Sequence, residues 1–156
     1  MKSSLSATIA IACTFLWMGF VCAISFLEAP LKFQAPGITL GLGLGIGRLV
    51  FAMLVKIEWI LALFILARFL FNQIHKFTSF HVCILIPILI LIMQTVWLLP
   101  ALDARAEQHI SGNTPSSSYH HVVYALAEIV KVLSLGIFGF RQLLNIQSTP
   151  LNNHSL

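Results

Sequence analysis

Four long apolar segments most constrain the fold of this 156-residue chain. They lie at about residues 5–27, 43–71, 80–100 and 119–141. A helix needs about 20 mostly apolar residues to cross a bilayer, and these segments meet that length. Backbone groups in lipid must be hydrogen-bonded internally, and the runs are too uniform for barrel strands, which alternate over about 10 residues. The segments therefore predict an all-α integral membrane protein, a bundle of four transmembrane helices.

The composition agrees with this class and excludes others. Hydrophobic residues make up 58% of the chain and charged residues only 9%, whereas soluble domains carry roughly a quarter charged residues. A soluble nucleic-acid-binding protein and a disordered chain are therefore excluded, and the expected partner is the lipid bilayer. The three cysteines lie in apolar segments without CxxC spacing, which argues against a disulfide framework or a zinc site. Residues 1–144 are expected to form one transmembrane domain, followed by a polar cytoplasmic tail at 145–156.

Basic residues near the helix ends indicate an orientation. With the amino terminus in the cytoplasm, the inner side holds Lys2, Arg68, Lys76 and Arg141, and the outer side holds Lys32, Arg105 and at most Arg48. Positive residues favour the cytoplasmic side, so both termini are predicted to lie there. No organelle address is visible, which favours the inner (plasma) membrane. The outer connections are then expected at 28–42 and 100–118.

Charged residues occur inside the second and fourth apolar segments. Lys56 and Glu58 lie mid-segment in the second, and Glu128 and Lys131 lie at an overlapping depth in the fourth. Each charge at a helix centre costs roughly 2.5–3.5 kcal/mol on insertion scales, so these groups are expected to face each other or a wet cavity. Lys56 and Glu58 are separated by roughly 200° around a helix and cannot pair with each other.

Helical spacing places the polar residues of the fourth segment on one stripe. Glu128 and Lys131 are three residues apart, His121 lies seven residues before Glu128, and Tyr124 lies between them. We expect this stripe to meet Glu58 or Lys56 of the second segment. The resulting polar seam would consist of Lys56, Glu58, Tyr124, Glu128 and Lys131.

The outer end of this seam is expected where the fourth segment begins. His120 and His121 lie there. The expected outer mouth consists of these two residues with Glu28, Arg48, Asp103 and Arg105. Arg48 and Glu28 lie near the outer ends of the second and first segments and are expected to form a second ion pair.

The histidines leave a metal or haem site open. His109, His120 and His121 share the predicted outer region, and Glu128 or Glu28 could add a carboxylate. These residue types can bind a transition metal, and two histidines can ligate haem. However, the chain has no HxxxH or HExxH spacing. The alternative is that these are interfacial histidines at helix ends, and the cofactor stays unknown.

Alternating glycines precede the second apolar run. Gly41 and Gly45, and Gly43 and Gly47, form two overlapping GxxxG pairs. Neither a P-loop nor the dinucleotide fingerprint is present. The pairs predict a close helix approach at this point.

Three short stretches give the chain a resemblance to a known family. They are residues 26–33 (FLEAPLKF), 97–105 (WLLPALDAR) and 119–121 (YHH). Their order and spacing resemble the membrane family typified by transmembrane protein 205, which has no agreed reaction. The resemblance implies four helices with a long third loop, although the loop here is shorter and the second segment is charged. It implies candidate polar positions at Trp97, Pro100, Asp103, Arg105, His120 and His121. A more remote likeness to copper-import membrane domains favours the metal alternative.

Three functions remain open at this point. The leading hypothesis is a non-enzymatic membrane protein that passes or senses a small ion or polar solute through the seam. One four-helix unit is small for a transporter, so a homo-oligomer or a membrane partner subunit is expected. The second hypothesis is a structural or accessory subunit whose buried charges fix helix register. The third is a metal- or haem-binding redox subunit.

Overall fold

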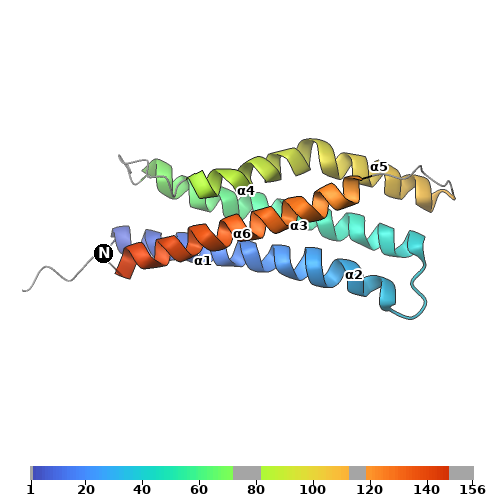
Figure 1. The fold of residues 1–156 in the computed structure, drawn as a ribbon, viewed down its shortest axis with the longest axis horizontal. Coiled ribbons are helices and arrows are strands. Elements are labelled where there is room, and N and C mark those ends of the chain that lie inside the picture. Colours follow the sequence, from blue (N-terminus) through green and yellow to red (C-terminus); the bar gives the residue numbers. More distant parts are fainter. Residues whose placement is uncertain (1, 72–81, 113–118, 148–156) are drawn as a thin grey trace, which may run out of the picture.

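The computed structural model describes residues 2–71, 82–112 and 119–147, and these residues form an antiparallel bundle of long helices (Figure 1). Four helices are long and apolar enough to cross a membrane, as the sequence predicts. Their candidate spans are Leu5–Gln34, Leu40–Arg68, Cys83–Ile110 and His120–Asn145. The first long helix begins and the fourth ends at one end of the bundle, called the terminal end here. The opposite end is called the distal end.

Two of the long helices are composites of shorter elements. The first consists of α1 (Lys2–Val21), the π-helix η1 (Cys22–Glu28), α2 (Ala29–Leu31) and the 3-10 turn η2 (Lys32–Gln34). The second is α3 (Leu40–Phe71). The third consists of α4 (Val82–Met93), the π-helix η4 (Gln94–Leu98) and α5 (Leu99–Ile110), and the fourth is α6 (His120–Gln147). The prediction of connecting segments at 28–42 and 100–118 is therefore wrong for residues 28–34 and 100–110, which are helical. The expected tail at 145–156 is helical up to 147, and the rest of it lies outside the described residues.

A π-helical turn before proline explains why both helices continue. Pro30 and Pro100 each stand in the first turn of a new helical segment. Proline lacks an N–H group, and its ring clashes with the carbonyl of the preceding turn, but it is tolerated at a helix start. The residue before each proline, Ala29 or Leu99, donates its N–H to a carbonyl five residues back. The widened turn thus lets the chain pass the proline without leaving the helix.

The long helices pack in a ring. α1 contacts α3 and α6. The third long helix contacts α6 through α4 and contacts α3 mainly through α5. The core is apolar, and Trp17, Ile65, Leu91, Leu135 and Phe138 are fully buried in it.

One glycine pair makes the close helix approach predicted from the GxxxG spacing. A Cβ atom on Gly43 would collide with the ring of Phe33, and one on Gly47 would lie 2.9 Å from Lys32 Nζ. Both neighbours belong to the end of the first long helix, so this approach lies within one chain. Gly41 and Gly45 have nothing within 4 Å of their Cβ positions.

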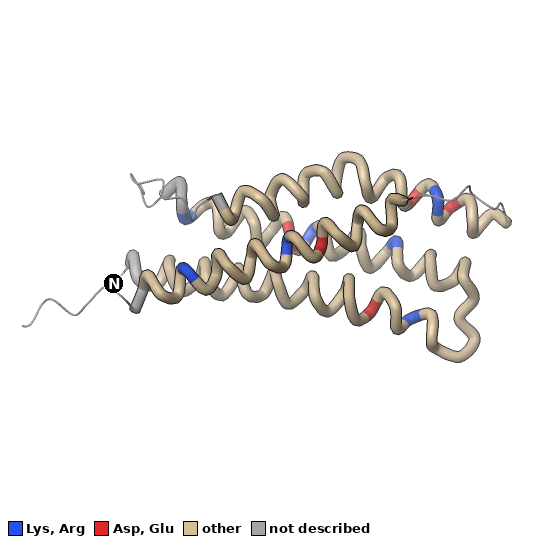
Figure 2. Tube along the Cα trace, viewed as in Figure 1, with Lys and Arg blue, Asp and Glu red and all other residues tan. Residues whose placement is uncertain are grey.

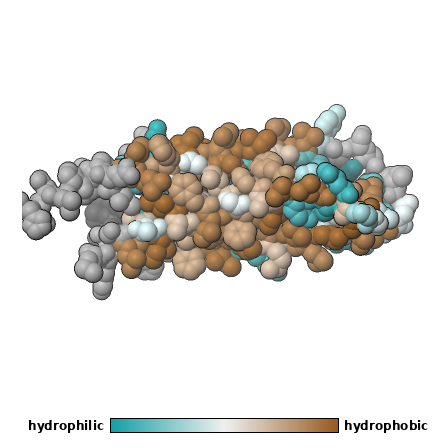
Figure 3. All heavy atoms as spheres, turned by 90° about the horizontal axis from the view of Figure 1, so that it is seen from below, coloured by the Kyte–Doolittle hydropathy of each residue, from teal (hydrophilic) through white to brown (hydrophobic). Residues whose placement is uncertain are grey.

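The outer surface of the bundle is mostly apolar along its length (Figure 3). Large side chains such as Leu49, Val96 and Leu133 are 73%, 74% and 61% exposed. Monomeric soluble proteins rarely expose continuous apolar areas of more than a few hundred Å². This surface is therefore typical of a chain surrounded by lipid.

Candidate functional site

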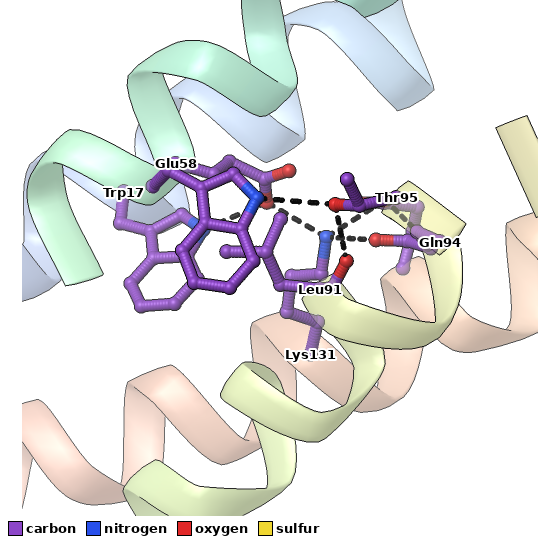
Figure 4. A network of polar contacts seen from close by, with 8 residues as sticks. Trp17, Glu58, Leu91, Gln94, Thr95 and Lys131 are labelled. Carbon is purple, nitrogen blue, oxygen red and sulfur yellow. Dashed lines mark hydrogen bonds and ion pairs between the residues drawn. The ribbon is translucent and has the colours of Figure 1, made fainter. Parts of the chain in front are cut away.

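Charged positions occur midway along the bundle (Figure 2). Five polar side chains from all four long helices meet there, and Figure 4 shows Trp17, Glu58, Gln94 and Lys131 among them. These five side chains are called the central cluster and comprise Trp17, Glu58, Gln94, Glu128 and Lys131. Every one of them is 0% exposed. Four of these residues lie within about three residues of the midpoint of their long helix. The fifth, Glu128, lies about one turn from Lys131 on α6, toward the distal end. The cluster is therefore enclosed at mid-depth, far from both ends.

Lys131 is the hub of this cluster. Its Nζ donates to Glu58 Oε1 at 2.7 Å and to Glu128 Oε1 at 3.1 Å. It also donates to the amide oxygen of Gln94. An ammonium group has three protons to donate, so these acceptors use its whole capacity.

Each of the two carboxylates accepts hydrogen bonds at only one of its two oxygens. Oε1 of Glu58 also accepts from Trp17 Nε1 at 2.7 Å, and Oε1 of Glu128 also accepts from Gln94 Nε2 at 2.6 Å. The Oε2 atoms of both are buried and have no hydrogen-bond partner among the described residues. Two oxygens can therefore still take a proton or another donor.

A second set of hydrogen bonds joins the third long helix to α3 (Figure 4). Trp59 Nε1 donates to Thr95 Oγ1 at 3.1 Å, and Thr95 in turn donates to the Leu91 carbonyl at 2.7 Å. Gln94 and Thr95 are the first two residues of the π-helix η4. Single π-helical turns inside α-helices occur frequently at functional sites.

Two more polar groups lie distal to the cluster. Tyr124 is one helical turn before Glu128 on α6 and is 5% exposed. Its ring packs edge-on against Phe51, with centroids 5.2 Å apart. Its hydroxyl interacts electrostatically with Glu128 and Glu58. The hydroxyls of Tyr124 and Ser25 are both buried without a hydrogen-bond partner among the described residues.

The structure thus brings Glu58, Glu128, Lys131 and Tyr124 together, as the stripe on the fourth segment predicts. It does not bring Lys56 to them. Lys56 is exposed on the outward face of α3. Because Lys56 and Glu58 lie roughly 200° apart on the helix, the rotation that buries Glu58 turns Lys56 outward.

The prediction of an ion pair between Glu28 and Arg48 is wrong. Arg48 forms ion pairs with both Asp103 and Glu107, and its Nη2 lies 3.0 Å from Asp103 Oδ2. Glu28 instead pairs with Lys32 at 3.3 Å. The helical course of α5 explains the difference, because it places Asp103 and Glu107 one turn apart on a face opposite Arg48.

The remaining predicted residues do not form one mouth or metal site. His120 is half-buried and its ring lies 5.9 Å from that of Trp97, whereas His121, in the first turn of α6, is exposed. His109 and Arg105 are half-buried on α5. Within the described part of the chain, no three histidine, cysteine or acidic side chains are placed to hold a metal. The metal set of His109, His120 and His121 is therefore not assembled.

Trp17 and Gln94 are the cluster members that sequence reasoning missed. Gln94, with Thr95, is polar within an otherwise apolar third segment, and that contrast was the available signal. Trp17 offered no such signal, because a tryptophan in an apolar helix is most often a packing residue.

Comparison with known proteins does not assign this chain to a family. No family model, no curated protein and no solved structure matches this chain. The resemblance to the transmembrane protein 205 family stays a prediction, and inference about function depends on the geometry of the central cluster.

Proposed function

We propose that this chain is an integral membrane protein that binds a proton in its central cluster and passes or senses it across the bilayer. The apolar outer surface and the four membrane-length helices support the membrane location. We place it in the inner membrane with both termini in the cytoplasm, the side that the positive residues favour. The observation that carries the proposal is the charge content of a fully buried site.

That charge content does not balance without a proton. Glu58 and Glu128, if both ionised, contribute two negative charges against the one positive charge of Lys131. An unpaired charge in a buried site costs several kcal/mol. Two carboxylates that share a site avoid this cost by holding one proton between them. The Oε2 atoms without partners are the positions where that proton binds.

Buried polar groups continue from the central cluster toward both ends of the bundle. Toward the distal end, the buried hydroxyls of Tyr124 and Ser25 continue the line of polar groups. Toward the terminal end, Ile65, Leu135 and Phe138 are fully buried and apolar, but the polar Thr14 is fully buried there too and Ser134 is only 7% exposed. Chains of polar groups inside membrane proteins commonly relay protons. A proton could therefore reach the cluster along polar groups from either end, as passage across the bilayer requires.

Infrared spectroscopy of the purified protein tests the bound proton directly. At neutral pH the exposed carboxylates are ionised, so the C=O stretch of a protonated carboxyl reports the buried pair. We expect this band in the wild type and its loss in both Glu58→Gln and Glu128→Gln. Either change leaves one carboxylate and one ammonium, which balance without a proton. Absence of the band in the wild type, or its persistence in both variants, would contradict the proposal.

Vesicle measurements then separate passing from sensing. Purified protein in vesicles with an internal pH-sensitive dye is given a pH gradient and a potassium diffusion potential. Proton flux that is lost in Glu128→Gln, with normal yield and folding, indicates passage. A protonated carboxyl without flux indicates sensing. Lys56→Gln is the matched control, because it also removes a mid-helix charge but lies outside the cluster.

The second candidate is an accessory subunit in which the cluster fixes helix register. The full use of the Lys131 protons favours it, since two of its three contacts join α6 to α3 and to the third long helix. It predicts that the two glutamine variants lose stability and that the wild type shows no protonated carboxyl.

A further inference from the structure

Lys56 is a charged residue in an apolar setting that the proposed function does not use. It lies at the middle of α3, within about one residue of the helix midpoint, and its side chain is exposed. No described residue forms an ion pair or hydrogen bond with it. A charge at the centre of a membrane helix is costly and normally has a partner.

Lipid headgroups are too far away to be that partner. The hydrocarbon core is about 30 Å thick, so a residue at its middle is about 15 Å from either interface. Lysine reaches out on a four-carbon stem, which cannot cover this distance. The partner of Lys56 must therefore lie at the same depth.

The neighbours of Lys56 on α3 have the pattern of a helix–helix seam. Leu49, Met53, Ile60 and Leu63 are 73%, 54%, 53% and 59% exposed. Together with Lys56 they follow alternating spacings of four and three residues, which is the heptad pattern of packed helices. We call these five residues the α3 seam. A single polar residue in such a seam selects register and partner at some loss of stability.

A second copy of this chain does not supply the missing anion. The chain has five acidic residues. Glu58 and Glu128 are enclosed in the central cluster. The other three already form ion pairs: Glu28 with Lys32, and both Asp103 and Glu107 with Arg48. A dimer through the α3 seam would also bring two Lys56 ammonium groups together.

We infer that the α3 seam docks a transmembrane helix of a different protein that carries an aspartate or glutamate near the bilayer midplane. The carboxylate would accept from Lys56 Nζ, and apolar side chains of the partner would pack against Leu49, Met53, Ile60 and Leu63. The charge of Lys56 at mid-depth indicates that the partner carries a carboxylate, and the heptad spacing of the α3 seam indicates that the partner is a helix.

Model helices test this inference without knowledge of the natural partner. The probe is a leucine-rich transmembrane peptide with one central glutamate, and its control is the same peptide with glutamine. Energy transfer between labelled peptide and labelled full-length protein is measured in phosphatidylcholine vesicles at mildly alkaline pH. We expect the glutamate peptide to associate about tenfold more tightly than the glutamine peptide. Lys56→Gln should abolish this preference, whereas Leu133→Ala, on the exposed face of α6, should leave it unchanged.

Three outcomes would overturn the inference. The first is equal association of both peptides with the wild type. The second is energy transfer between two labelled copies of the protein that increases in Lys56→Gln, which would make the seam a homodimer surface. The third is a difference between wild type and Lys56→Gln that appears only in vesicles with anionic lipid, which would make lipid the partner. The infrared band of the central cluster should be the same in Lys56→Gln, so this inference and the proposed function can fail separately.

Discussion

At the scale of single residues, the two mid-helix lysines have opposite environments. Lys131 is fully buried and donates to three acceptors from three long helices, counting Glu128 on its own helix. Lys56 is exposed and has no partner among the described residues. Both are lysines inside an apolar span, and only their neighbours distinguish a structural hub from a docking residue.

Replacing each lysine by methionine should therefore have different effects on stability. Lys131→Met leaves two buried carboxylates without their cation and is expected to lower the free energy of unfolding by about 3–5 kcal/mol. Lys56→Met changes an exposed side chain and is expected to change it by less than about 0.5 kcal/mol. Unfolding in mild detergent, titrated with a denaturing detergent, measures both. Equal losses in the two variants would contradict the assignment of Lys131 as the hub.

At the scale of elements, the π-helical turns decide where the polar groups lie. η4 begins at Gln94 and places it in the cluster, and it lets the helix pass Pro100 into α5. The helical course of α5 then aligns Asp103 and Glu107 with Arg48. If residues 100–110 belonged to a loop, as the sequence pattern suggests, this contact would not form.

Limited proteolysis tests the helical state of α5. Trypsin cleaves after arginine in flexible loops but not within a stable helix, because the chain must unfold locally to be cut. Cleavage after Arg105 in the detergent-solubilised protein is expected to be at least tenfold slower than after heat denaturation, as followed by mass spectrometry of the fragments. Rapid cleavage at this site in the folded protein would instead favour the loop.

At the scale of the whole molecule, four long antiparallel helices put the two described chain ends at the same end of the bundle. The connection between η2 and α3 lies at the opposite end (Figure 1). The central cluster lies midway between the two ends. The molecule therefore has a polar site that either end of the bundle can reach only through its interior.

Surface labelling tests the predicted orientation. Thr39 is exposed in the distal connection, and the native Cys13, Cys22 and Cys83 can be replaced by alanine. Thr39→Cys in this background should react with a membrane-impermeant maleimide added to intact cells, because the positive residues predict that the distal end lies outside. A cysteine added after the carboxyl terminus should react only after the membrane is opened. The reverse result would invert the orientation.

The four apolar segments, and the charges inside two of them, could be predicted from the amino-acid sequence alone. Which residues share a face of α6 could also be predicted, because three-, four- and seven-residue spacings fix relative angles around a helix. Tyr124, Glu128 and Lys131 could therefore be grouped from their spacing alone. The separation of Lys56 from Glu58 follows from the same arithmetic.

Which of these two residues faces inward could not be predicted, because it depends on how the helices pack. Spacing fixes the angle between side chains on one helix, but the rotation of the whole helix depends on what it packs against. The contacts of α3 with α1 and α5 set that rotation and bury Glu58. The same packing brought in Trp17 and Gln94, whose role depends on helices far away in the sequence. Partners across helices are chosen by three-dimensional packing, which no local pattern encodes.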